Sequence, residues 1–87
     1  MNLSAIALAT LGLALASQAH AGPTCAASKD GWKPEAAFRK ELQAQGYQIK
    51  VFKVTKGNCY EIYGHDKAGK KVEIYFDPVS GKPVKSE

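Results

Sequence analysis

Apolar and polar residues alternate with a period of two in the C-terminal half of the chain, and this period predicts β-strands. Three runs carry the pattern, at residues 47–55, 59–64 and 71–77. Tight turns at Lys56-Gly57 and at residues 66–69 are expected to join them. After a further turn that contains Pro78 and Gly81, Val84 is expected to begin a short fourth strand. The pattern therefore predicts an antiparallel β-meander of three to four strands.

The spacing becomes helical just before these strands. Residues 35–45 are mostly strong helix formers, Pro34 suits a first turn, and Gly46 suits the stop. Phe38 and Leu42 lie four positions apart and form a short apolar stripe. The predicted fold class is α+β, with one N-terminal helix packed on the sheet.

The turn at 66–69 predicts which side chains share a face. If Asp66 pairs with Lys70, Ile62 lies opposite Ile74, whereas a slip of one residue would place Glu61 there. The face that receives the helix is expected to collect the apolar side chains of all three runs: Ile49, Val51, Tyr60, Ile62, Val72, Ile74 and Phe76.

The other face of the predicted sheet is less polar than open surface usually is. It is expected to hold Phe52, Val54, Cys59, Tyr63 and Tyr75 among Lys50, Glu61, Lys71 and Glu73. Two interpretations stay open, because apolar patches on small domains are either covered or used. Residues 22–31, an irregular leader, would cover the face together with Trp32. Alternatively a partner binds there, and the candidate partner surface is Phe52, Tyr63, Lys71 and Tyr75.

The first 21 residues have the pattern of a signal peptide. They contain no charged side chain, and residues 5–16 form an apolar run too short to span a bilayer. Ala19-His20-Ala21 has the small-x-small form of a cleavage site, so cleavage is expected after Ala21. A retained membrane anchor is the alternative. The sequence thus predicts an exported protein, periplasmic or secreted.

Two cysteines, Cys25 and Cys59, follow the predicted signal. A small exported domain is where a structural disulfide is expected, and this bridge would tie the leader to the sheet. Closing a loop of about 35 residues stabilises by roughly 3 to 4 kcal/mol in the chain-entropy model. A metal site is the rival interpretation, but two thiols without a nearby histidine pair make a poor ligand set.

Charge and the remaining polar residues give no catalytic constellation. The net charge of +4 comes from lysines spread over strands and turns, unlike the clustered charge of nucleic-acid binders. His65-Asp66 is expected in a turn, and Glu61 and Glu73 are expected to pair with Lys50 and Lys71 across strands. No enzyme activity, metal or cofactor is therefore predicted.

Residues 32–84 resemble the PepSY family in its small exported form, the peptidase propeptide and YPEB-type domain. The resemblance rests on Gln45-Gly46-Tyr47, on residues 57–63, and on residues 66–81 with their Asp-Pro-x-x-Gly ending. It implies a domain at 32–87 with a helix on an antiparallel sheet and no catalytic residues. The motif residues are expected to be structural: Tyr60, Glu61, Asp77, Pro78 and Gly81.

The resemblance implies a non-catalytic binding module, expected to regulate or inhibit a peptidase. The expected partner is an envelope protein, bound by the candidate surface or by an edge strand. Two alternatives stay open. The protein could be an accessory of a membrane redox system with a cytochrome, or a cationic domain that associates with the envelope surface without spanning the membrane.

Overall fold

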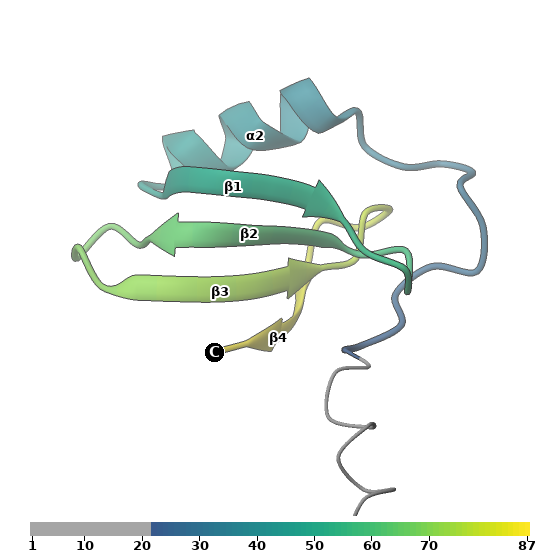
Figure 1. Ribbon diagram of the computed structural model, residues 1–87. Helices are drawn as coiled ribbons and strands as arrows, with labels where there is room; N and C mark the ends of the chain where they lie inside the picture. Colours follow the sequence, from purple (N-terminus) through teal and green to yellow (C-terminus); the bar gives the residue numbers. More distant parts are fainter. Residues whose placement is uncertain (1–21) are drawn as a thin grey trace, which may run out of the picture.

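One helix and four strands follow one another along residues 22–87, the part of the chain that this computed structural model describes. They are α2 (Glu35–Ala44), β1 (Gln48–Val54), β2 (Tyr60–His65), β3 (Lys71–Phe76) and β4 (Pro83–Ser86). The strands form one antiparallel sheet in the order β1-β2-β3-β4, with α2 over one face (Figure 1). The predicted α+β fold is confirmed. The expected signal peptide and its cleavage site lie outside the described residues.

The helix begins and ends where the sequence predicted, to within a residue. Pro34 precedes it, and the Phe38 amide donates to the Pro34 carbonyl at 2.9 Å. At the other end, Gly46 adopts a φ of 100°. The Gly46 amide donates to the Gln43 carbonyl and the Tyr47 amide donates to the Leu42 carbonyl. These two hydrogen bonds define a Schellman motif. This ending turns the chain directly into β1.

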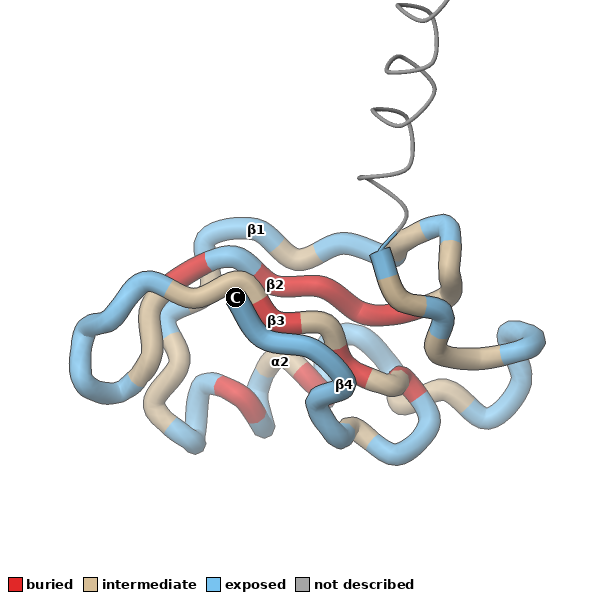
Figure 2. Tube along the Cα trace, turned by 90° about the horizontal axis from the view of Figure 1, so that it is seen from below, coloured by how far each residue is buried: buried red, intermediate tan, exposed pale blue. Residues whose placement is uncertain are grey.

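The register between β2 and β3 is the predicted one. Tyr60 pairs with Phe76 and Ile62 with Ile74. These side chains are buried together with the helix residues, and the core cluster is Phe38, Leu42, Tyr60, Ile62, Ile74 and Phe76. Figure 2 shows the buried positions along the two central strands and on α2. The period-two pattern was decisive here because a slip would have buried charged residues.

The register of β1 departs from the prediction at Lys50. Ile49 pairs with Gly64 and Val51 with Tyr63, so two steps along β1 match one step along β2. Lys50 is the extra residue of a β-bulge. Every side chain after it therefore lies on the face opposite to the one that strict alternation assigns.

Three predicted positions, those of Val51, Phe52 and Val54, are wrong for this reason. Val51, expected in the core, lies on the open side, and Phe52, expected on the open side, lies under α2. The Phe52 ring is centred 4.9 Å from Tyr60 and 6.4 Å from Phe38. Burying the larger aromatic ring removes more apolar surface from water than burying valine. Val54, also expected on the open side, pairs with Tyr60 on the helix side but stays largely exposed.

Gly64 permits the bulge by its lack of a side chain. A β-carbon on Gly64 would lie 1.9 Å from the carbonyl oxygen of Gln48. The backbones of β1 and β2 therefore approach more closely here than any other residue type would allow.

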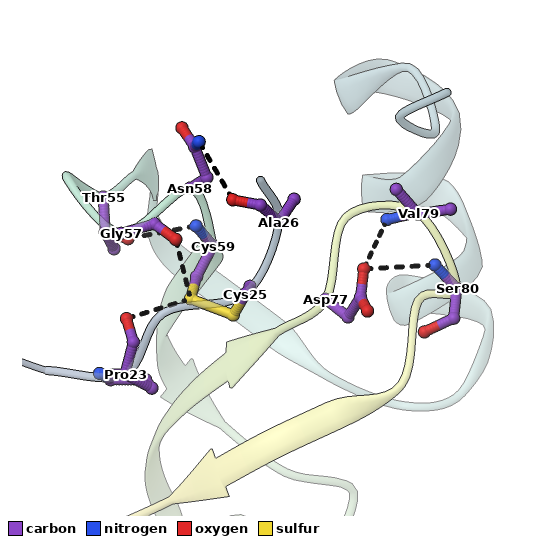
Figure 3. The surroundings of a disulfide bond; sticks show 10 residues. All are labelled: Pro23, Cys25, Ala26, Thr55, Gly57, Asn58, Cys59, Asp77, Val79 and Ser80. Atoms are coloured by element: carbon purple, nitrogen blue, oxygen red, sulfur yellow. Dashed lines mark hydrogen bonds between the residues drawn. A yellow bond between two sulfur atoms is a disulfide. The ribbon is translucent and has the colours of Figure 1, made fainter. Parts of the chain in front are cut away.

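A disulfide joins Cys25 to Cys59 and confirms the predicted pairing, with the two Cα atoms 5.0 Å apart. Neighbouring polar contacts support it (Figure 3). The Cys25 amide donates to the Gly57 carbonyl at 2.8 Å, and the Asn58 side-chain amide donates to the Ala26 carbonyl at 3.1 Å. The leader is thereby fixed to the β1–β2 turn.

Trp32 does not follow the leader to the open side, contrary to the expectation. The chain runs around one end of the sheet between residue 22 and α2 (Figure 1). The Trp32 ring then packs edge-on against Tyr60 on the helix side, with centroids 5.4 Å apart. Its Nε1 donates to the Ser28 carbonyl at 2.8 Å. The indole thus buries apolar surface in the core while its N–H keeps a partner.

The Asp-Pro-x-x-Gly segment forms the turn between β3 and β4. The Asp77 carboxylate accepts from the Val79 amide at 2.8 Å, and the Gly81 amide donates to the Asp77 carbonyl at 2.7 Å. Pro78 is fully buried, and its carbonyl accepts from the Lys33 amide at 2.8 Å. The turn therefore also holds the segment that leads into α2.

Candidate functional site

The sheet face opposite α2 is called the open face below. Paired positions in β1, β2 and β3 place nine side chains on it: Gln48, Val51, Lys53, Glu61, Tyr63, His65, Lys71, Glu73 and Tyr75. Three of the four predicted partner-surface residues, Tyr63, Lys71 and Tyr75, are therefore on one face. Phe52 is not, because the bulge turns it toward the core. Val51 and Lys53 were missed for the same reason, and no period-two signal could have found them.

Glu61 is the buried charged residue of the open face, with 3% of its surface exposed. One carboxylate oxygen, Oε1, lies 4.0 Å from Lys53 Nζ. The other oxygen, Oε2, is buried and has no hydrogen-bond partner. It is the one buried side-chain nitrogen or oxygen atom of residues 22–87 that lacks a partner. The predicted partner was Lys50, but the bulge places Lys53 opposite Glu61 instead.

Glu73 and Tyr75 surround Glu61 from β3. Tyr75 pairs with Glu61 across the strands, and Glu73 pairs with Tyr63, so the two carboxylates are diagonal neighbours. The Tyr75 hydroxyl donates to Glu73 Oε2 at 3.2 Å. Lys71, the predicted partner of Glu73, pairs with His65 across the strands.

Titration of these groups is shifted by burial and by their proximity. Burial, followed by the facing Glu73, raises the pKa of Glu61 above its usual range. The adjacent carboxyl group of Glu61 lowers the pKa of Glu73. The pKa of Tyr63 is raised, first by Glu73 and then by Glu61. Burial, then Glu61, raises the pKa of Tyr75 to about 12. Glu61 and Glu73 together carry more negative charge than Lys53, which faces Glu61, can offset.

Two hollows flank the cluster on the open face. One, of about 420 Å³, lies toward the β2–β3 turn and is lined by Lys50, Tyr63, Gly64, His65, Lys71, Val72, Glu73 and Glu87. The other, of about 320 Å³, lies between the leader and the sheet and is lined by Gly22, Pro23, Lys53, Val54, Thr55, Lys56, Glu61, Tyr63 and Tyr75. The leader therefore covers only the end of the face near Cys59.

Asp66, beside His65, binds the backbone of the β2–β3 turn. The Asp66 carboxylate accepts from the Ala68 and Lys70 amides, both at 2.9 Å, and so caps the turn predicted for it.

Within residues 22–87, no three His, Cys, Asp or Glu side chains are grouped closely enough to hold a metal ion. No helix in that part of the chain has both the length and the apolar character needed to cross a membrane.

Comparison with known proteins gives one finding. No curated protein matches the chain. No solved structure matches it either. Residues 3–87, however, match the family described as peptidase propeptide and YPEB domain. The match covers nearly the whole chain and agrees with the helix-on-sheet architecture and with the resemblance in residues 32–84. The chain therefore belongs to the peptidase propeptide and YPEB domain family.

Proposed function

We propose that this protein is a non-catalytic binding module, acting outside the cytoplasm, that regulates a peptidase. The observation that carries the proposal is membership of a family described by its peptidase propeptides. Domains of this family are propeptide or inhibitory modules and are typically extracellular or periplasmic. The expected signal peptide and the disulfide between Cys25 and Cys59 support the same compartment.

The exposed part of the open face is the proposed contact surface. Tyr63 and Val51 pair across β1 and β2 and are 37% and 46% exposed. Lys53 lies 5.4 Å above the Tyr63 ring, and the hollow beside Tyr63 is bordered by Lys71. Tyrosine is enriched among the anchor residues of protein interfaces. Tyr75 extends the surface toward the leader.

The test is inhibition of a peptidase in trans. The oxidised protein would be mixed with envelope peptidases from the organism that encodes it, and residual activity measured against its concentration. Saturable inhibition by wild type supports the proposal. Combining Val51→Ala with Tyr63→Ala should weaken inhibition about tenfold or more, since each lost interface anchor costs about 1 to 2 kcal/mol. Val79→Ala, at a residue 48% exposed in the β3–β4 turn, is the matched control.

Two other results would redirect the proposal. Specific co-purification with a b-type cytochrome, and no effect on any peptidase, would favour the membrane redox alternative. Binding to anionic vesicles that disappears at high salt, again with no effect on peptidases, would favour an electrostatic envelope association. Equal inhibition by wild type and by the double variant would remove the open face from the proposal while keeping the regulatory function.

A further inference from the structure

A buried carboxylate oxygen without a partner marks the end of the open face nearest the leader. The Glu61 side chain is 4% exposed, and its Oε2 accepts no hydrogen bond from residues 22–87. Leaving a buried polar atom unpaired destabilises the folded state, and more so for a charged group. Such an atom indicates that a donor belongs beside it.

The first residues of the leader line the hollow in front of Glu61. Gly22 and Pro23 line it from one side, and Glu61, Tyr63 and Tyr75 line it from the other. A β-carbon built on Gly22 would lie 3.8 Å from the Tyr75 hydroxyl, which itself donates to Glu73. The Gly22 nitrogen is two bonds from that position. The Gly22 backbone therefore lies beside the Tyr75 hydroxyl, in the hollow that Glu61 also lines.

The leader is held against the sheet from Pro23 to Cys25. Cys25 is held by the disulfide and by its amide bond to Gly57. The Pro23 carbonyl oxygen lies 3.4 Å from Cys59 Sγ. A β-carbon on Gly57 would lie 2.3 Å from this oxygen, so the turn accepts Pro23 only because residue 57 is glycine. The position of Gly22 therefore follows from the fold of the sheet.

The cleavage site predicted from the sequence lies immediately before this residue. Hydrolysis of the Ala21–Gly22 peptide bond by a signal peptidase consumes one water, leaves a carboxylate on Ala21, and leaves on Gly22 an amine that takes up a proton. We propose that the hollow lined by Glu61 and Tyr75 is a binding site for a primary ammonium, and that its ligand is the Gly22 α-ammonium of the mature chain.

The unpaired Glu61 oxygen favours an occupant that donates hydrogen bonds. Two lysines, Lys53 and Lys56, also line the hollow, and Lys53 faces Oε1 of Glu61 rather than the unpaired Oε2. An α-ammonium supplies three donors, one of which the free Glu61 oxygen needs. The arrangement makes export and folding interdependent, because the ligand does not exist until the signal is removed. The inference rests on cleavage after Ala21 and is independent of peptidase binding.

The test begins with the full-length chain, expressed with its own signal and purified from the exported fraction. Mass spectrometry identifies the first residue, which must be Gly22. The Cα resonance of Gly22, labelled with 13C-glycine, is then followed against pH by NMR. An α-amino group ordinarily titrates near pH 7.7 to 8.0. A bound ammonium should titrate at least about one unit higher, which is a tenfold stronger hold on its proton.

Two variants with equal charge change locate the site. Glu61→Gln should remove at least half of the rise in the Gly22 pKa. Glu41→Gln, on α2 at the other face of the sheet, should leave it unchanged within about 0.2 units, because its charge is distant and screened. A different first residue, an ordinary α-amino pKa in the wild type, or an equal response to both variants would overturn the proposal. The wild-type titration decides the matter even if Glu61→Gln does not fold.

Discussion

The Tyr60 hydroxyl donates a hydrogen bond to the backbone carbonyl of Lys33, 27 residues earlier in the chain. The Tyr60 ring lies in the core and stacks on Phe38 of α2 with centroids 5.6 Å apart. The Lys33 amide, in turn, donates to Pro78 in the β3–β4 turn. Lys33, in the segment that leads into α2, is therefore hydrogen-bonded both to β2 and to the β3–β4 turn.

Tyr60→Phe should test this connection. The ring and its packing remain, but the half-buried carbonyl of Lys33 loses its donor, so the free energy of unfolding should fall by about 1 to 2 kcal/mol. Urea denaturation followed by circular dichroism would measure the loss. Tyr47→Phe, which removes the same hydroxyl from a half-buried ring, is the control and should cost no more than about 0.5 kcal/mol. Equal losses in both variants would contradict the role given to the bond.

Removing the disulfide should destabilise the domain substantially. The loop between Cys25 and Cys59 spans 34 positions, and releasing it restores entropy to the unfolded chain worth about 3 to 4 kcal/mol. Cys25→Ala combined with Cys59→Ala would be compared with the oxidised wild type by urea denaturation. Alanine is used because Cys59 is fully buried, where serine would bury a hydroxyl. Free thiols in the oxidised wild type, or a loss below about 1 kcal/mol, would refute this prediction.

Tyr75 should titrate well above an ordinary tyrosine. Burial, then the charges of Glu61 and Glu73, raise its pKa to about 12. Since the folded state holds this proton more tightly than the unfolded state, Tyr75 contributes stability below about pH 10, and that contribution is lost as the pH rises toward 12. The difference in ultraviolet absorbance between wild type and Tyr75→Phe reports the Tyr75 pKa alone.

Glu61→Gln should lower the Tyr75 pKa, because it removes the second largest cause of the shift. Glu41→Gln makes the same charge change on α2 and should leave it in place. A Tyr75 pKa near 10 in the wild type would show that the carboxylates do not act on this hydroxyl.

Gly64→Ala should be poorly tolerated. The new methyl group would collide with the Gln48 carbonyl, and moving that carbonyl would break the ladder between β1 and β2. We expect a loss of about 3 kcal/mol, at the upper end for overpacking. Gly69→Ala is a suitable comparison, because nothing lies within 4 Å of its β-carbon position and only the positive φ opposes the change, at about 1 kcal/mol. Similar losses at the two sites would contradict the close approach at Gly64.

Local sequence determined most of the fold. The ends of α2 follow from Pro34 and Gly46, and the register of β2 with β3 follows from Asp66 and from the alternation of Tyr60, Ile62, Ile74 and Phe76. These features depend on residues close together in the chain, whose preferences act in the same direction. The disulfide was also predictable, since the chain holds only two cysteines.

The candidate site depended on contacts between distant residues. Whether Val51 or Phe52 entered the core was decided by the close approach of Gln48 to Gly64, which introduced the bulge at Lys50. That shift placed Lys53 beside Glu61 and the exposed Val51 beside Tyr63. Sequence determined the elements and the central register because those follow from local preference and period. Only the tertiary structure decided the open face, because a one-residue bulge reverses every side chain after it and leaves no periodic trace.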